Sequence, residues 1–179
     1  MTNEMSKCSN DIDPKMVDSV KAHLSGDVLS NTLDFFDYLK ENGMSLSLGF
    51  MHEERGFYYV FYEGVNICHT SLMVGKSRDG IEPNTMCFWP IGKFPCEPEG
   101  FPLNERMKAT AQANANTCGK CGSCGKSDPG TPEVIFGRNF DKLCHTVIEI
   151  INPDREKIEC LKKLMDMKKF VVDSEKQEQ

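Results

Sequence analysis

Residues 57–74 read Phe57-Tyr-Tyr-Val-Phe-Tyr-Glu-Gly-Val-Asn-Ile-Cys-His-Thr-Ser-Leu-Met-Val74, and this stretch decides the fold. Aromatic and β-branched residues dominate both of its halves, which is typical of β-strands. Glu63-Gly64, which separates the two halves, is a turn signal. The stretch therefore predicts two antiparallel strands, 57–62 and 65–74, joined by a tight turn.

Elements of both kinds are predicted around this hairpin. Strands are expected where apolar residues alternate or β-formers cluster, at 45–51, 85–91 and 144–151. Helices are expected where apolar residues recur at helical spacing, at 14–24, 28–41, 103–116 and after the capping pair Asn152-Pro153. The sequence thus predicts an α+β fold: an antiparallel sheet of about five strands with N-terminal helices, a central helix, a cysteine loop and a C-terminal helix.

The 179 residues are enough for one domain with its own hydrophobic core. Residues 1–13 are expected to form a disordered leader and 173–179 a flexible tail, because both stretches are polar. A single α+β domain is therefore predicted over 14–172, with a metal-binding loop at 117–126.

Composition narrows the classes of partner. The chain carries a formal net charge of −6 and has no dense run of Lys and Arg, so a nucleic-acid partner is not expected. Its longest uninterrupted apolar stretch, 57–62, is far too short to cross a bilayer, and its N-terminus lacks the apolar core of a signal peptide. These features predict a cytoplasmic protein without a membrane partner.

Nine cysteines is a high and odd number for a chain of this length. Three of them, Cys118, Cys121 and Cys124, lie close together with two residues between neighbours. That spacing is awkward for a framework of disulfides with distant partners. Reduced thiols that bind a metal ion explain the pattern better.

The cysteine cluster has the chemistry of a zinc site. Zinc favours thiolate ligands at about 2.3 Å in a tetrahedron, and two-residue spacers allow successive sulfur atoms to turn back onto one ion. A glycine follows each cysteine of the cluster, and glycine adopts tight-turn conformations without strain. Lys120 and Lys126 add positive charge near the thiolates. Cys118, Cys121 and Cys124 are therefore predicted to bind one zinc ion.

A tetrahedral structural site needs a fourth ligand, and three residues are candidates. Cys144 and His145 follow the cluster at a spacing compatible with zinc sites. Neighbouring side chains of a strand point to opposite faces, so only one of the two is expected to reach the ion. Cys144 is the preferred fourth ligand, His145 the runner-up, and Cys96 in the proline-rich loop a further donor.

Two other uses of the cluster stay open. An iron–sulfur cluster is the main competitor, although the ferredoxin-type run would continue with a fourth cysteine before a proline, and here Ser127-Asp128 precede Pro129. Cysteines in Cys-x-x-Cys pairs also support thiol–disulfide exchange. No catalytic constellation stands out, so the sequence favours a non-enzymatic zinc-binding module for a small molecule or a protein partner.

Two further patterns carry weaker hypotheses. The string Cys-His-Thr occurs at 68–70 and at 144–146, which would form a second site if the two strands lay side by side; buried, inert cysteines are the expected alternative. The aromatic residues of the sheet either line a ligand pocket or pack on the helices. They are Phe57, Tyr58, Tyr59, Phe61, Tyr62, Phe88 and Trp89.

The order of several segments resembles small, largely uncharacterised bacterial α+β proteins with a CxxCxxC cluster. The segments are 34–39, 62–68, 118–124, 135–141 and 151–154. In those proteins an N-terminal helix and an aromatic hairpin precede the cluster, and a cysteine-containing strand and a closing helix follow it. The helix–meander–helix layout is also loosely similar to the YdhG/YjbR type of small α+β domain. The resemblance implies a layout and brings no activity with it.

Overall fold

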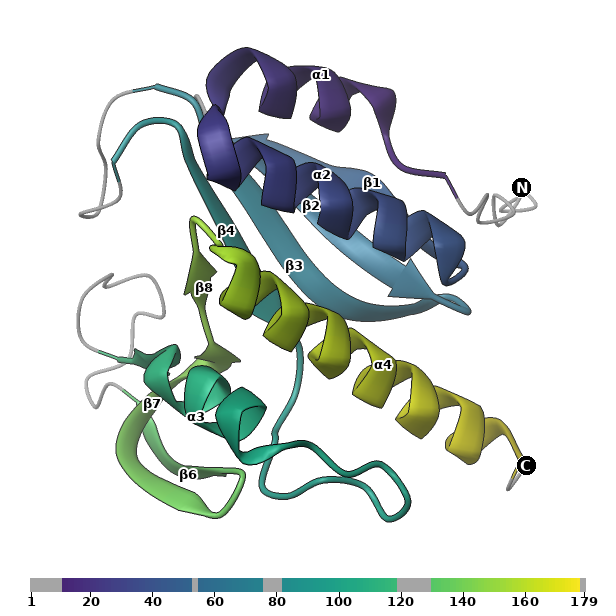
Figure 1. Cartoon of the computed structure of the whole chain (residues 1–179), viewed down its shortest axis with the longest axis vertical. Helices are drawn as coiled ribbons and strands as arrows, with labels where there is room; N and C mark the ends of the chain where they lie inside the picture. The colour runs from purple at the N-terminus through teal and green to yellow at the C-terminus, as the bar shows by residue number, and fades with distance from the viewer. Residues whose placement is uncertain (1–10, 53–54, 76–81, 119–129, 178–179) are drawn as a thin grey trace, which may run out of the picture.

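The computed structural model describes residues 11–52, 55–75, 82–118 and 130–177, and it has an α+β fold with two antiparallel sheets (Figure 1). The helices are α1 Pro14–His23, α2 Gly26–Glu41, α3 Glu105–Ala113 and α4 Arg155–Gln177. The strands are β1 Met44–His52, β2 Arg55–Tyr62, β3 Val65–Met73, β4 Thr85–Pro90, β5 Ala115–Thr117, β6 Thr131–Ile135, β7 Arg138–Ile148 and β8 Ile150–Ile151. The predicted fold class is confirmed.

The larger sheet has five strands in the order β1-β2-β3-β4-β8, and every neighbouring pair in it is antiparallel. The hairpin predicted from 57–74 forms its centre as β2 and β3, with Glu63 and Gly64 both at positive φ in the turn. Across the sheet Tyr58 pairs with Thr70 and Thr70 with Phe88, so these three side chains share one face.

Helices α1, α2 and α4 all lie on that face of the sheet (Figure 1). The ring of Phe35 from α2 meets the ring of Phe88 edge-on, with the two ring centroids 5.1 Å apart. Met16 and Val20 of α1 are fully buried, as is Leu161 of α4. The main core of the protein therefore lies between this sheet face and the three helices.

Polar contacts fix the crossing of α2 and α4. The amide nitrogen of Asn31 donates to the carbonyl of Pro153 at 3.0 Å, and Lys162 forms an ion pair with Asp34 at 2.7 Å. The hydroxyl of Tyr38 donates to the carboxylate of Asp166, and burial, more than this bond, raises the pKa of Tyr38 above its usual value. These directional bonds set the register between two helices that apolar packing alone would allow to slide.

A second sheet of three strands, in the order β5-β7-β6, lies below the first in Figure 1, with α3 beside it. The sequence prediction was wrong at three places here: 115–117 is a strand and not the end of a helix, β6 had not been expected, and β7 begins at Arg138 and not at Cys144. All three errors concern backbone pairing to β7, which supplies the ladder partners of β5 and β6.

Both ends of the described chain contact distant parts of the molecule. Ile12 forms a parallel bridge with Leu46, and the side chain of Asp13 accepts a bond from the backbone N–H of Lys15 at the start of α1. At the other end α4 continues to Gln177, and the hydroxyl of Tyr62 donates to Asp173 at 3.0 Å. Long-range partners therefore hold residues that the sequence assigned to a leader and a tail. Within the described ranges, no helix has both the length and the apolar character that a membrane crossing requires.

Phe88 offers a test of the main core. Its side chain is fully buried at the centre of the sheet and packs on Phe35, so Phe88→Ala is expected to lower the free energy of unfolding by about 3–5 kcal/mol. Val65, which is 45% exposed at the start of β3, is the control, and Val65→Ala should cost about 1 kcal/mol or less. Urea denaturation followed by circular dichroism measures both values; equal losses would contradict the assigned core.

Candidate metal centre

The cysteine cluster belongs to the connection between β5 and β6. These two strands lie on either side of β7 in the small sheet. Thr117 at the end of β5 and Thr131 at the start of β6 both pair with Leu143 of β7. Cys118 directly follows Thr117, whereas Cys121 and Cys124 lie outside the described residues. The cluster is therefore attached to the sheet at Leu143, one residue before Cys144.

The two ends of this connection touch each other. The backbone N–H of Cys118 donates to the carbonyl of Lys142 at 3.1 Å. Gly130 has φ +83°, and a Cβ atom placed on it would lie 2.9 Å from the Cβ of Cys118 and 3.1 Å from the carbonyl oxygen of Leu143. Only glycine fits this close approach without displacing β7 or Cys118. Contact between the two ends closes the connection onto the strand that holds Cys144.

Cys144 directly follows the residue of β7 that is paired with the end of β5. Leu143 pairs with Thr117, the residue before Cys118, and the N–H of Cys118 donates to the carbonyl of Lys142. Two cysteine side chains that lie close in space can hold one ion between their sulfur atoms, at about 2.3 Å from each. The position of Cys144 therefore suits a ligand that the cluster would share.

β7 is irregular where it carries Cys144 and His145. Ala115 pairs with Ile148 but Thr117 pairs with Leu143, so the register shifts across both residues. The Sγ atom of Cys144 lies 3.4 Å from Nδ1 of His145, although Cys144 is buried and His145 is exposed. The expectation that only one of the two faces the cluster stays a prediction, because Cys121 and Cys124 lie outside the described residues.

Cys96 is placed away from the other candidates. The chain next to it bonds to the β6–β7 turn, with Gly137 N–H donating to the carbonyl of Pro95 at 3.0 Å. That turn and Leu143 are at opposite ends of β6, which rises roughly 3.3 Å per residue and so separates them by roughly 13 Å. Cys96 is thus the least suitable of the three candidates for a fourth ligand.

Within the ranges that the structure describes, no three His, Cys, Asp or Glu side chains are grouped closely enough to hold a metal ion. The described part of the centre consists of Cys118, Cys144 and His145, and the two remaining cysteines of the cluster are outside it. Metal binding consequently stays a prediction from the sequence, to which the structure adds the placement of Cys118 beside Cys144.

The second Cys-His-Thr string does not form a joint site with the first. Cys68 is fully buried on the helix face, where burial raises the pKa of its thiol well above the usual range. His69 points to the opposite face, and its pKa is lowered by burial first and then by the nearby charge of His145. The two histidines thus lie near each other although β3 and β7 belong to different sheets.

The aromatic residues of the sheet are divided between its two faces. Tyr58 and Phe88 pack under the helices, whereas Phe57, Tyr59 and Trp89 occupy the face that the helices leave uncovered. Phe50 stacks on Phe57 with ring centroids 4.6 Å apart. Alternation along each strand therefore separates the set, so that part of it packs on the helices and part lies on the opposite side of the sheet.

Arg55 lies among the aromatic side chains of the uncovered face. Its guanidinium is 4.6 Å from the ring centroid of Phe57 and 5.2 Å from that of Trp89, and its Nε donates to Ser71 at 3.0 Å. The neighbouring rings of Tyr59 and His69 have centroids 4.8 Å apart. Planar groups and one cation thus lie together on this side of the sheet, for which we use the name aromatic face, and Trp89 is its buried member.

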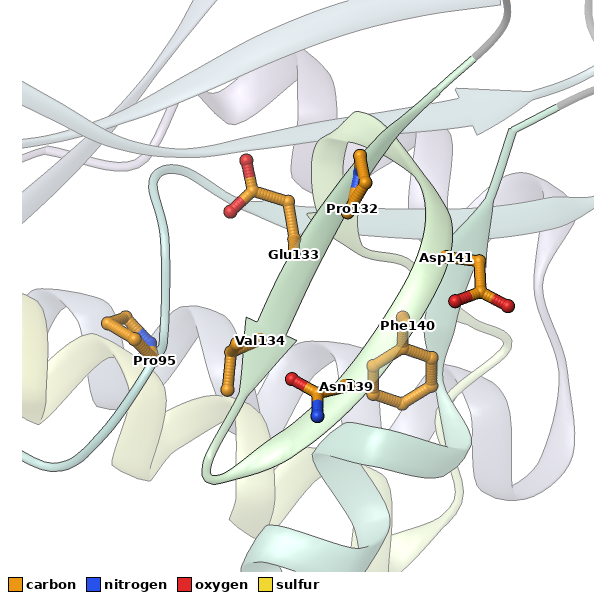
Figure 2. A pocket seen from close by; sticks show the side chains of 7 residues that line it. All are labelled: Pro95, Pro132, Glu133, Val134, Asn139, Phe140 and Asp141. Carbon is orange, nitrogen blue, oxygen red and sulfur yellow. The ribbon is translucent and has the colours of Figure 1, made fainter.

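A separate hollow lies on the β6–β7 hairpin (Figure 2). Figure 2 shows the side chains of Glu133 and Asp141 pointing in different directions, and Glu133 forms an ion pair with Lys93 at 2.7 Å. The carboxylates therefore do not converge as a metal site or an acid–base pair would require. The hollow is lined by Pro95, Pro132, Glu133, Val134, Asn139, Phe140 and Asp141.

Comparisons of the chain with protein-family models, with curated proteins and with solved structures found no match. The resemblance to small bacterial α+β proteins stays an expectation.

Gly130→Ala tests the closure of the connection onto β7. Gly137→Ala is the matched control, because Gly137 also has a positive φ of +81° but has open space where a Cβ would be added. The control should lose about 1–2 kcal/mol of unfolding free energy, the usual cost of a left-handed conformation. Gly130→Ala should lose about 1–3 kcal/mol more, because its Cβ meets Cys118 and Leu143. Equal losses in urea denaturation would contradict the close approach.

Alkylation of the native protein tests which thiols are available. Burial raises the pKa of both Cys87 and Cys160 to about 12, and that of Cys68 still further, so all three stay protonated and covered. Iodoacetamide at about pH 8 should therefore modify the exposed Cys96 and leave these three unmodified, as read by peptide mass spectrometry. Rapid labelling of Cys68 in the folded protein would show that the helix layer is misplaced.

Proposed function

We propose that this chain is a zinc-binding protein in which Cys118, Cys121, Cys124 and Cys144 hold one ion. The observation that carries the proposal is the placement of Cys118 and Gly130, which bracket the cluster and both lie against Lys142–Leu143, next to Cys144. A cluster attached at this point has its fourth thiol within reach. The ion would tie the β5–β6 connection to the middle strand of the small sheet.

The charge around the centre supports a thiolate site. Four thiolates and one Zn²⁺ carry a net charge of −2, which nearby cations would offset. Lys120 and Lys126 belong to the cluster in sequence, and Lys142 is the exposed residue opposite Cys118 on β7. Three lysines thus adjoin the predicted ligands in sequence or across the ladder, in a chain that is acidic in its overall charge.

The order of preference for the fourth ligand is Cys144, then His145, then Cys96. Cys144 completes a set of four thiolates, which zinc favours in structural sites. His145 stays a substitute because its Nδ1 atom lies only 3.4 Å from the sulfur of Cys144. Cys96 comes last because it lies at the far end of the β6–β7 hairpin.

The role that we propose for the ion is structural. Zinc that binds folded but not unfolded protein adds its binding free energy to folding, and here it would fix the small sheet and the adjoining connection. The module so formed would bind a small molecule or a protein partner through the aromatic face, and the proposal assigns it no reaction. This face offers stacking surfaces and the Arg55 cation within one sheet.

Elemental analysis of protein purified without added metal tests the ion directly. About one zinc per chain is expected, and Cys121→Ser should lower the zinc content and reduce the melting temperature by about 10 °C. Cys96→Ser is the matched control, since it removes an exposed cysteine at the far end of the hairpin and should change neither value. Iron with a brown colour would contradict the proposal in favour of an iron–sulfur protein. Metal-free protein whose cluster thiols oxidise reversibly would contradict it in favour of a redox protein.

Cobalt substitution identifies the fourth ligand. Thiolate ligands give Co²⁺ strong charge-transfer absorption, so Cys144→Ser should weaken this band and His145→Gln should leave it unchanged. The reverse result would move the fourth ligand to His145.

A further inference from the structure

The second half of β1 is an exposed apolar edge of the larger sheet. β1 is the outermost strand in the order β1-β2-β3-β4-β8. Leu48, Phe50 and Met51 are 42%, 46% and 58% exposed, and these three follow one another along the last part of the strand. Proteins usually protect such an edge with charged residues, with proline or with a covering segment, because its open backbone groups can pair with another strand.

Hydrogen bonds in the first half of β1 show which of its backbone N–H and C=O groups point away from β2. The N–H of Leu46 donates to the carbonyl of Asp11 at 3.2 Å, and its carbonyl accepts from the N–H of Asp13 at 2.9 Å. Both groups of Leu46 therefore point away from β2. The register with β2 is regular from Leu46 to Leu48 and shifts only between Leu48 and Phe50. Alternate residues of the regular part repeat the same direction, so the N–H and C=O of Leu48 also point outward.

The described N-terminal segment does not cover this part of the edge. Residues 11–13 run parallel to β1 and pair only at Leu46, after which the chain turns into α1 at Pro14. No strand of the described chain lies beyond β1 alongside Leu48–Met51. The free window of the edge thus begins where the pairing of Ile12 with Leu46 ends.

We propose that this window is a self-association surface, at which β1 pairs with β1 of a second copy of the chain in antiparallel orientation. Antiparallel pairing of two identical strands has two-fold symmetry, so one set of residues serves both copies. It would supply hydrogen-bond partners for the outward groups of Leu48 in each copy. The two five-stranded sheets would then continue as one.

The side chains of the window suit this occupant. Phe50 lies on the aromatic face beside Phe57, whereas Leu48 and Met51 pair with Tyr58 and Gly56 on the helix side. Pairing of two copies would therefore bury apolar surface on both sides of the new strand pair. β1 contains no Asp, Glu, Lys or Arg, so two acidic molecules can approach along it without placing like charges opposite each other. Because the window is short, we expect a dimer in exchange with monomer.

Sedimentation equilibrium of the full chain over a wide range of concentrations tests the proposal. The wild-type protein should show a concentration-dependent monomer–dimer equilibrium. Leu48→Lys places a charge on both copies at the pairing surface and should raise the dimer dissociation constant at least roughly tenfold. Val65→Lys is the matched control, because Val65 is a strand residue with similar exposure (45%) that lies away from this edge, and it should dimerise like the wild type.

Thermal melts of both variants establish that the monomer still folds, and Leu48→Pro provides a second probe. Proline removes the outward N–H of residue 48 while the bonds between β1 and β2 persist, so this variant should also weaken the dimer. A wild-type protein that is monomeric at every concentration would overturn the proposal. A dimer that Leu48→Lys and Val65→Lys weaken equally would overturn it as well.

Discussion

Hydrogen bonds to Glu149 fix the position of the small sheet relative to the large sheet. The positions of the other features of the molecule depend on this junction. Glu149 is the single residue between β7 of the small sheet and β8 of the large one. Its backbone N–H donates to the carbonyl of Asn114 at 2.9 Å, and its carboxylate accepts from Nε1 of Trp89 at the same distance. These two bonds tie the β7–β8 junction to the end of α3 and to β4, and so fix the position of the small sheet relative to the large one.

The side chain of Asn152 completes the junction on the other side of β8. Its Oδ1 accepts from the N–H of Met86 at 2.8 Å, while its own N–H donates to the carbonyl of Met86 at 2.8 Å. Asn152 has φ +42°, a left-handed conformation that asparagine tolerates better than most residues. The chain can therefore leave β8 and enter α4 directly, with Pro153 accepting from Asn31 of α2.

Because of this arrangement, a bound metal ion would have to fix only a short part of the chain in place. Strand pairing already holds Cys118, Gly130 and Cys144 together, so the ends of the connection are close before any ion binds. Closing a loop costs conformational entropy. Here the backbone hydrogen bonds of β5 and β6 with β7 offset most of that cost. An ion would then need to order only the cluster between those ends. Its binding would in turn resist the separation of β5 and β6 from β7.

Local patterns in the sequence were sufficient for the elements whose partners are near in the chain. The aromatic run of β2, the Glu63-Gly64 turn and the caps of the helices identified the large sheet and its helix layer. The small sheet was not predictable in this way, because Ala115–Thr117 and Thr131–Ile135 carry weak strand signals and are strands only through their pairing with β7. Tertiary pairing outweighed local preference there.

The candidate site shows the same limit. Spacing alone predicted a site shared by Cys118 and Cys144, and the register of β5 with β7 pairs the residues that precede them, Thr117 and Leu143; a shared ion stays a prediction. The irregular register around Cys144 and His145 was not predictable, since a register shift is a property of the pairing and leaves no mark in a single strand's sequence. Alternation along the strands separated the aromatic residues into two faces.

If the protein binds a partner as proposed, the distribution of charge favours the aromatic face as the place for it. Strands β1 to β4 contain no Asp, Glu or Lys, and Arg55 is their only charged side chain apart from histidine. The carboxylate at the border of the face belongs to Glu149, and Trp89 already occupies one of its oxygens. The acidic excess behind the net charge of −6 therefore comes from residues outside these four strands. A neutral or acidic partner would meet the least electrostatic repulsion on this face, where stacked rings and one guanidinium offer attractive contacts.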